Sequence, residues 1–302
     1  MKTSFISTVF NEESNIERFL KSILKQTKKP DEIIIVDGGS KDKTYEILKK
    51  YAKKNKKLRV FQEKGVNIAK GRNIAISKAK GDILIASDAG CVIDKNWVKD
   101  TLRYFPKADV VVGNYKAITK NNFEFFQSFI AFKHVNKNIP SRMSSRNIAF
   151  KKKCWKEVEG YPEDFLTGED TRFNIKLIKK GYKIEQNPKP YVAWEMRPTL
   201  KKFAKQFYLY GKGDRIQKNL LKKRMKKNLL MVFGFWIYLV VFLIMGLVKP
   251  TISLWMVLVP LAILVLYSFK FLIKTGKISA LFWIPIIMIT KRVSYILGVT
   301  FK

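Results

Sequence analysis

Acidic residues are scarce in this sequence and unevenly distributed. Of 302 residues, 24 are Asp or Glu and 59 are Lys or Arg, which gives a formal net charge of +35. No acidic residue lies between Leu229 and Lys302, and only seven basic residues do. The chain therefore divides into a charged part that suits water and an apolar tail that does not.

Other scarcities narrow the class of protein. Cys91 and Cys154 are the two cysteines and His134 is the single histidine, which excludes a disulfide framework and a Cys/His zinc motif. His134 suits a structural role as well as a functional one. No Gly-x-Gly-x-x-Gly follows the first expected strand, which argues against a dinucleotide-dependent dehydrogenase. The apolar run near Met1 is too short for a signal peptide, so we expect the charged part to stay cytoplasmic.

The tail contains long apolar runs. Leu229–Val248 is twenty residues without a charge, enough at about 1.5 Å per residue to cross about 30 Å of hydrocarbon. After a turn, Thr251–Ile273 is a second expected span, in which Lys270 lies near the end and reaches the interface. Ile278–Thr290 is shorter and predicts an interfacial helix, a re-entrant segment or half of a third span.

Basic residues flank the tail. Thr199–Asn228 carries eleven basic residues against Asp214 alone, and such a segment beside a span attracts anionic headgroups. The positive-inside rule compares Lys222–Lys227 with the lone Lys249 and places the start of the first span inside the cell. The other lysines are equally typical of an ion-pair-rich surface. We therefore expect a soluble domain (1–198), a basic amphipathic linker (199–228) and a membrane region (229–302), with a membrane and not a nucleic acid as the anionic partner.

Short strands and amphipathic helices alternate in the charged part. This alternation predicts an α/β fold with a mainly parallel sheet and helices on both faces. Ligands bind such sheets at the carboxyl ends of the strands. Those ends hold Thr8–Glu12, Asp37–Gly39 and Ser87–Gly90. The expected strands are Ser4–Phe10, Glu32–Val36, Leu58–Gln62 and Asp82–Ala86, and the expected helices start near Ile16 and span Lys43–Lys53 and Ile68–Ala79.

Four motifs occur in order along the charged part: FISTVFNEESNIERFLKSILKQT, EIIIVDGGSKDKT, GVNIAKGRNIAISKAKGDILIASDAGC and FLTGEDTRFNIKLIKKGYKI. Together they resemble family 2 of the glycosyltransferases, an inverting group with the GT-A fold. The resemblance covers Met1–Gly213. It implies a GT-A domain that binds a nucleotide-diphosphate sugar, followed here by a C-terminal membrane-spanning region.

The resemblance implies a nucleoside site. Thr8 and Phe10 match positions that line the nucleobase and ribose, with Glu12 close by. Asp37 matches the acid that accepts a hydrogen bond from the base or ribose, and Arg72 matches a basic residue near the base or phosphates. Other roles stay open, because a Phe often packs in the core, an Asp often caps a turn, and an Arg often lies on a solvated helix face.

The resemblance also implies a site for the donor diphosphate. Asp88 matches the first acid of an Asp-x-Asp motif that holds a divalent cation, Mg²⁺ or Mn²⁺, against the leaving diphosphate. Ala89 follows, and Gly90 stands where the second Asp is expected. Asp94 is displaced along the chain. One carboxylate, completed by diphosphate oxygens and water, is still a normal ligand set for magnesium.

The acceptor side follows from the last motif. Asp170 matches the general base that takes the proton of the acceptor hydroxyl, and Glu169 orients the acceptor. A plain helix N-terminal acid would look the same in sequence. Arg146 and Asn147 resemble a segment flanking the acceptor, and Arg197 either reaches the diphosphate or pairs with a neighbouring acid. The full Gln-x-x-Arg-Trp motif of processive relatives is absent, which argues against a polysaccharide synthase.

These residues predict a membrane-anchored enzyme. We expect it to move a sugar, of the hexosyl type, from a nucleotide donor to a lipid-linked or membrane-proximal hydroxyl, with inversion. A polyprenyl-phosphate sugar synthase is the alternative within the same class, since its phosphate acceptor needs no general base. A basic, membrane-tethered, non-catalytic binding protein is the alternative of another class. We expect loops such as Val112–Phe126 to shape the donor pocket.

Overall fold

The computed structural model describes residues 1–131, 136–138, 142–165, 167–216 and 222–301, so His134 lies outside the described residues. These residues form two compact units that do not follow one another along the chain. The first contains Met1–Ile118 and Lys133–Glu195, and the second contains Thr119–Phe132 and Met196–Lys302. The second unit therefore takes a segment that lies between two strands of the first.

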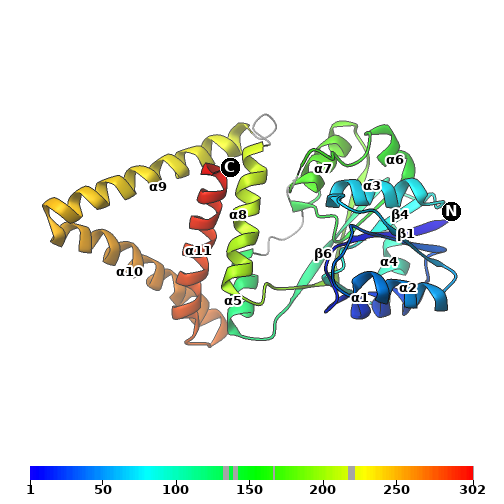
Figure 1. Cartoon of the computed structure of the whole chain (residues 1–302), viewed down its shortest axis with the longest axis horizontal. Helices are drawn as coiled ribbons and strands as arrows, with labels where there is room; N and C mark the ends of the chain where they lie inside the picture. The colour runs from blue at the N-terminus through cyan, green and yellow to red at the C-terminus, as the bar shows by residue number, and fades with distance from the viewer. Residues whose placement is uncertain (132–135, 139–141, 166, 217–221, 302) are drawn as a thin grey trace. The chain divides into compact units, whose positions relative to one another are not determined.

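Four parallel strands form one half of the sheet in the first unit. β1 lies between β2 and β4, and β3 pairs with the other side of β2. Figure 1 shows α1 and α2 on one face of these strands and α3 on the other. The predicted mainly parallel α/β sheet is confirmed. The elements are β1 (Thr3–Val9), α1 (Ile16–Leu24), β2 (Glu32–Asp37), α2 (Thr44–Lys54), β3 (Leu58–Gln62), α3 (Ile68–Lys78) and β4 (Ile83–Ala86).

The rest of the sheet is mixed. The strand order is β3-β2-β1-β4-β7-β6-β8-β5, with β7 antiparallel to both β4 and β6. The expectation of a loop at Val112–Phe126 was wrong, because its β-branched start continues a strand and its aromatic end begins a helix. These elements are β5 (Cys91–Ile93), α4 (Trp97–Leu102), β6 (Val110–Ile118), β7 (Ile148–Lys151), α6 (Lys152–Glu157), α7 (Glu169–Lys179) and β8 (Ile184–Glu195).

Helix α3 lies unusually close to β1. A Cβ on Gly71 would come within 2.3 Å of the Thr8 Oγ1, so only glycine permits this approach. Apolar side chains of β1, β2 and β4 fill the space beneath α3, among them Ile6, Ile34 and Leu84, all fully buried. This packing fixes the position of Gly71 on β1. It therefore also holds the next residue, Arg72, above the carboxyl ends of the strands.

The second unit is helical. Three of its helices are long and apolar enough to cross a membrane, with candidate spans at Leu230–Val248, Pro250–Thr275 and Ala280–Thr300. The third is one continuous helix and extends well beyond the expected Ile278–Thr290. The elements of this unit are α5 (Asn122–Ala131), α8 (Leu200–Ile216), α9 (Lys222–Val248), α10 (Pro250–Thr275) and α11 (Ala280–Thr300).

Candidate active site

The carboxyl ends of β1, β2 and β4 lie at one edge of the sheet. Their parallel register pairs Val9 with Asp37 and Ile6 with Ala86. The Ser7 hydroxyl donates to the Ser87 carbonyl at 2.8 Å, which holds the residues after β4 against β1. The three polar segments that the sequence places at strand ends are therefore neighbours, as expected for a ligand site in such a sheet.

Arg72 joins two acids from distant parts of the chain. Its guanidinium donates to Asp88 at 2.7 Å and to Glu169 at 2.6 Å, and only 4% of its side chain is exposed. The cation also lies over the Tyr161 ring, 5.5 Å from its centroid. The side chain is thus neither on a solvated helix face nor free in a pocket, but ties β4 to the start of α7.

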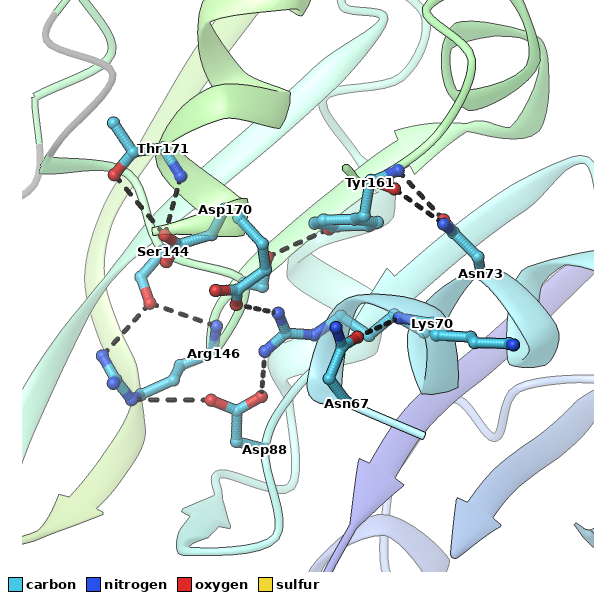
Figure 2. A network of polar contacts seen from close by, with 12 residues as sticks. Asn67, Lys70, Asn73, Asp88, Ser144, Arg146, Tyr161, Asp170 and Thr171 are labelled. Atoms are coloured by element: carbon cyan, nitrogen blue, oxygen red, sulfur yellow. Dashed lines mark hydrogen bonds and ion pairs between the residues drawn. The ribbon is translucent and has the colours of Figure 1, made fainter. Parts of the chain in front are cut away.

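Arg146 approaches the same carboxylate from another side. Its Nε lies 3.6 Å from Asp88, and Nη1 donates to the Ser144 hydroxyl at 3.2 Å. The guanidinium stacks over the Trp194 ring, 4.0 Å from the centroid. Figure 2 shows Arg146 and Asp88 in one connected network of polar contacts. The Asp88 carboxylate is thus flanked by two cations while about a quarter of its side chain (24%) is exposed.

Asp170 occupies the first turn of α7. Gly168 precedes the helix with φ +84°, a conformation that favours glycine, and lets the chain turn into it. The Asp170 carboxylate accepts from the Thr171 backbone N–H at 2.7 Å. Burial, followed by the neighbouring Glu169 carboxylate, raises the pKa of Asp170 to about 6, against the lowering influence of Arg72 and Arg146. This carboxyl can therefore exchange a proton near neutral pH.

Asp37 closes the turn after β2. Its fully buried carboxylate accepts from the backbone N–H groups of Gly39 and Ser40 at 3.2 and 3.0 Å, from the Ser40 hydroxyl, and from the Gln62 amide at 2.9 Å. The turn-capping alternative is thus observed. The side chain still lies at the edge where the nucleoside is expected, and contact with a base or ribose stays a prediction.

The residues after β1, Phe10 to Glu12, lie near the surface, unlike the buried Asp37. Phe10 is 56% exposed and so does not belong to the core. Asn11 follows with φ +52°, and its amide oxygen accepts from the Lys41 N–H at 2.9 Å. Glu12 accepts from the Asn15 side chain at 3.2 Å beside the start of α1. An exposed aromatic ring at the end of a strand offers a flat surface to a nucleobase.

Two of the predicted acceptor-side residues have structural partners. Asn147 is buried, with its amide oxygen accepting from the Trp97 indole at 2.8 Å and its amide group donating to the Asn114 carbonyl at 2.7 Å. Arg197 belongs to the second unit, where it donates to Gln206 at 3.1 Å. The Glu195 carboxylate contacts Arg18.

The sequence patterns did not indicate the role of Asn73, which hydrogen-bonds to the segment before α7. Asn73 binds the Tyr161 backbone with both amide atoms, at 2.7 and 2.9 Å, and accepts from the Trp155 indole at 2.9 Å. The Tyr161 ring stacks on Phe173 of α7 at 4.1 Å and its hydroxyl contacts Ser145 at 3.0 Å. The position of Asn73 directly after Arg72 could have indicated its role, because both residues lie in the same turn of α3.

The side chains of the site provide only some of the oxygen ligands that a hard divalent cation needs. Within the described residues, no group of three or more His, Cys, Asp and Glu side chains is placed so that it could hold a metal ion by itself. Asp88 offers a partly exposed carboxylate, and a Cβ built on Gly90 meets nothing within 4 Å, so there is open space beside it. A single carboxylate with free space fits a magnesium-like ion that takes its other ligands from a diphosphate and water.

Comparison with known sequences identifies the family of the chain. The model of glycosyl transferase family 2 matches residues 4–158, and that of glycosyl transferase family group 2 matches residues 88–290. The chain is 28% identical over 267 residues to the dolichyl N-acetyl-alpha-D-glucosaminyl phosphate 3-beta-D-2,3-diacetamido-2,3-dideoxy-beta-D-glucuronosyltransferase of Methanococcus voltae, covering 81% of this chain and 82% of that relative. It is 26% identical over 224 residues to the glycosyltransferase AglE of Haloferax volcanii, covering 70% and 72%.

Solved structures show the same fold. S. aureus TarS in complex with UDP matches with a TM-score of 0.54 and 25% identity, over 70% of this chain and 64% of that one. The mannosyltransferase PcManGT from Pyrobaculum calidifontis, in complex with GDP-Man and Mn²⁺, matches with a TM-score of 0.56 and 18% identity, over 71% and 62%. The first unit is thus a GT-A domain, and since a family model covers half of the sequence, the chain belongs to glycosyl transferase family 2.

Proposed function

We propose that this enzyme transfers a sugar from a nucleotide-diphosphate donor to a hydroxyl of a lipid-linked acceptor, with inversion, at the cytoplasmic face of the cell membrane. The observation that carries the proposal is the Arg72 bridge, which brings the donor acid Asp88 beside the Glu169–Asp170 pair. Support also comes from a relative named for a dolichyl-linked acceptor and from neighbours that hold UDP or GDP-Man.

Asp170 serves as the general base. It takes the proton of the acceptor hydroxyl while that oxygen attacks the anomeric carbon from the face opposite the leaving diphosphate. A pKa of about 6 leaves the carboxylate mostly ionised at neutral pH, yet basic enough to accept a proton. Glu169, held by Arg72, fixes the first turn of α7 and so the direction of the base.

The donor side needs positive charge. Arg146, stacked on Trp194, places a guanidinium next to Asp88, where the diphosphate would lie. Asp88 would hold the Mg²⁺ or Mn²⁺, which would neutralise charge on the leaving diphosphate, with Ala89 and Gly90 leaving room for it. Thr8, Phe10, Glu12 and Asp37 would receive the nucleoside.

The test uses purified full-length enzyme in detergent, a panel of nucleotide sugars, and polyprenyl-linked acceptors that end in a sugar hydroxyl or in a phosphate. Asp170→Asn should lower transfer to the hydroxyl by about 10²- to 10⁴-fold. Asp164→Asn, an exposed acid before the same helix, is the matched control and should keep its activity. If Asp170→Asn still transfers sugar to a polyprenyl phosphate, the enzyme is instead a polyprenyl-phosphate sugar synthase.

A further inference from the structure

Helix α11 has the length and composition of a membrane span but carries two cations at its centre. The Lys291 amine donates to the Ile130 carbonyl at 2.8 Å and lies over the Phe207 ring, 5.2 Å from the centroid. Lys291 is therefore bound to α5 and α8. Arg292, next to it, is exposed. Charged side chains are costly at the centre of a bilayer, so this position disfavours a crossing.

Helix α8 accompanies α11 over its whole length. Near the start of both, Phe203 packs in one apolar cluster with Ala280 and Ile284. Farther along, the backbones touch, since a Cβ on Gly298 would lie 2.0 Å from the Tyr208 carbonyl. At the end of both, Arg215 reaches the Thr300 carbonyl at 3.5 Å. The two helices run side by side in the same direction, as Figure 1 shows.

Because of this pairing, α11 cannot cross a bilayer without α8. Three lysines on α8, Lys201, Lys202 and Lys205, are exposed. Asp214, also on α8, accepts from the Tyr295 hydroxyl at 2.7 Å. Within the described residues α8 is not among the helices that are both long and apolar enough to span a membrane. The crossing would thus carry all these charges into hydrocarbon together with those of α11.

The paired helices suit a membrane surface instead. Alongside Arg292, α11 exposes apolar side chains at Phe282 and Ile289, while most of its other residues are partly or fully buried. Exposed apolar residues on α11 together with exposed lysines on α8 are the composition of a helix layer lying in the headgroup region. In contrast, Leu230–Val248 of α9 and Pro250–Thr275 of α10 are apolar nearly all round, and few of their residues are buried.

We propose that α5, α8 and α11 lie together on the membrane surface, with the α8 lysines against anionic lipid headgroups, and that α9 and α10 are the two crossings in the described part of the chain. This inference rests on the membrane anchoring proposed above. It places Phe301 on the side of the bilayer from which α9 departs, whereas a crossing by α11 would place it on the opposite side.

Single cysteines in the full chain, labelled with a membrane-impermeant maleimide in sealed vesicles of known orientation, test the arrangement. The native Cys91 and Cys154 are buried and give little background. Lys53→Cys reports the catalytic unit and Lys249→Cys the tip between α9 and α10. We expect Phe301→Cys to label together with Lys53→Cys. Labelling of Phe301→Cys together with Lys249→Cys would overturn the inference, whereas labelling of Lys249→Cys on the Lys53 side would overturn the anchoring itself.

Depth measurements provide an independent readout. Spin labels at the exposed positions Phe282, Ile289 and Thr300, in nanodiscs with anionic lipid, should all report the same shallow depth. A label at Leu258, in the middle of α10, is the control and should lie near the bilayer centre. If Ile289 proves to be as deep as Leu258 while Phe282 and Thr300 stay shallow, α11 is a span and the proposal is wrong.

Discussion

The two units distribute apolar and charged side chains in opposite ways. In the first, apolar strands are buried and the deepest charges, such as Arg72 and Glu169, are paired with each other. In the second, many apolar side chains of α9 and α10 are exposed, among them Leu247 at 89%, while Gln206 and Tyr210 hydrogen-bond to each other at 2.8 Å. The difference shows that only the first unit is built for water on all sides, since exposed apolar area of this extent marks a surface that meets lipid or a partner.

The Arg72 bridge gives the largest expected effect in this comparison. Arg72→Met leaves Asp88 and Glu169 near each other without a counter-charge, and breaking a buried pair in this way costs about 3–5 kcal/mol. Arg59→Met is the matched control, because Arg59 pairs with Glu32 at 3.0 Å but is 36% exposed, and such pairs contribute about 0–1 kcal/mol. Thermal unfolding of the detergent-solubilised enzyme measures both. Equal effects would show that burial of the Arg72 network does not stabilise the fold.

A pair of leucines sharpens the contrast between the units. Leu84 in β4 is fully buried, and Leu258 in α10 is 41% exposed. Leu84→Ala should destabilise the first unit by about 2–5 kcal/mol, because it leaves a cavity. Leu258→Ala removes contact with the surrounding lipid or detergent and should change stability little. A large loss for Leu258→Ala would mean that a protein surface, and not lipid, covers α10.

The two acids in the first turn of α7, Glu169 and Asp170, should set the pH dependence of the enzyme. Since the pKa of Asp170 is about 6 and the ionised form acts as the base, kcat/KM should fall about tenfold per pH unit below pH 6. Glu169→Gln removes a neighbouring negative charge, so it should lower the pKa of Asp170 and move this fall in kcat/KM to lower pH.

The same carboxyl should also affect stability. Because its folded-state pKa lies above the ordinary value of 3.8, the stability that comes from binding this proton is present below about pH 4 and lost as pH rises through 6. Asp170→Asn should therefore raise the melting temperature at pH 8. If Glu169→Gln leaves the acidic side of the pH–rate profile unchanged, a group other than Asp170 controls it.

The smallest expected effect concerns Gly90. Nothing lies within 4 Å of a Cβ at this position, so Gly90→Asp should fold normally. A second carboxylate beside Asp88 should lower the Mg²⁺ concentration for half-maximal activity by about tenfold, since ligand charge tunes the affinity for hard cations. Asn55→Asp, in a loop before β3, adds the same charge elsewhere and serves as the control. An unchanged Mg²⁺ dependence in Gly90→Asp would indicate that no cation binds beside Asp88.

Much of the site was predictable because parallel strands force their carboxyl ends together. Asp37 and Asp88 follow apolar runs at Glu32–Val36 and Asp82–Ala86, and the register confirms that these ends are neighbours. The partners of Asn147 and Arg197 were not predictable. The bond from Asn147 to Asn114 depends on a contact between distant parts of the chain. The bond from Arg197 to Gln206 depends on how the segment after β8 turns into α8, which no residue pattern specifies.

The sequence by itself determined the family, the strand–helix alternation and the two apolar helices α9 and α10, since periodicity and long uncharged runs are local properties. The tertiary structure decided what the scarce charges do. It buried Arg72 between two acids that come from different strands and helices, and it paired the apolar α11 with the basic α8. The physical reason is the same in both cases: whether a charge or an apolar helix is tolerated depends on its neighbours in space, and those neighbours come from distant parts of the chain.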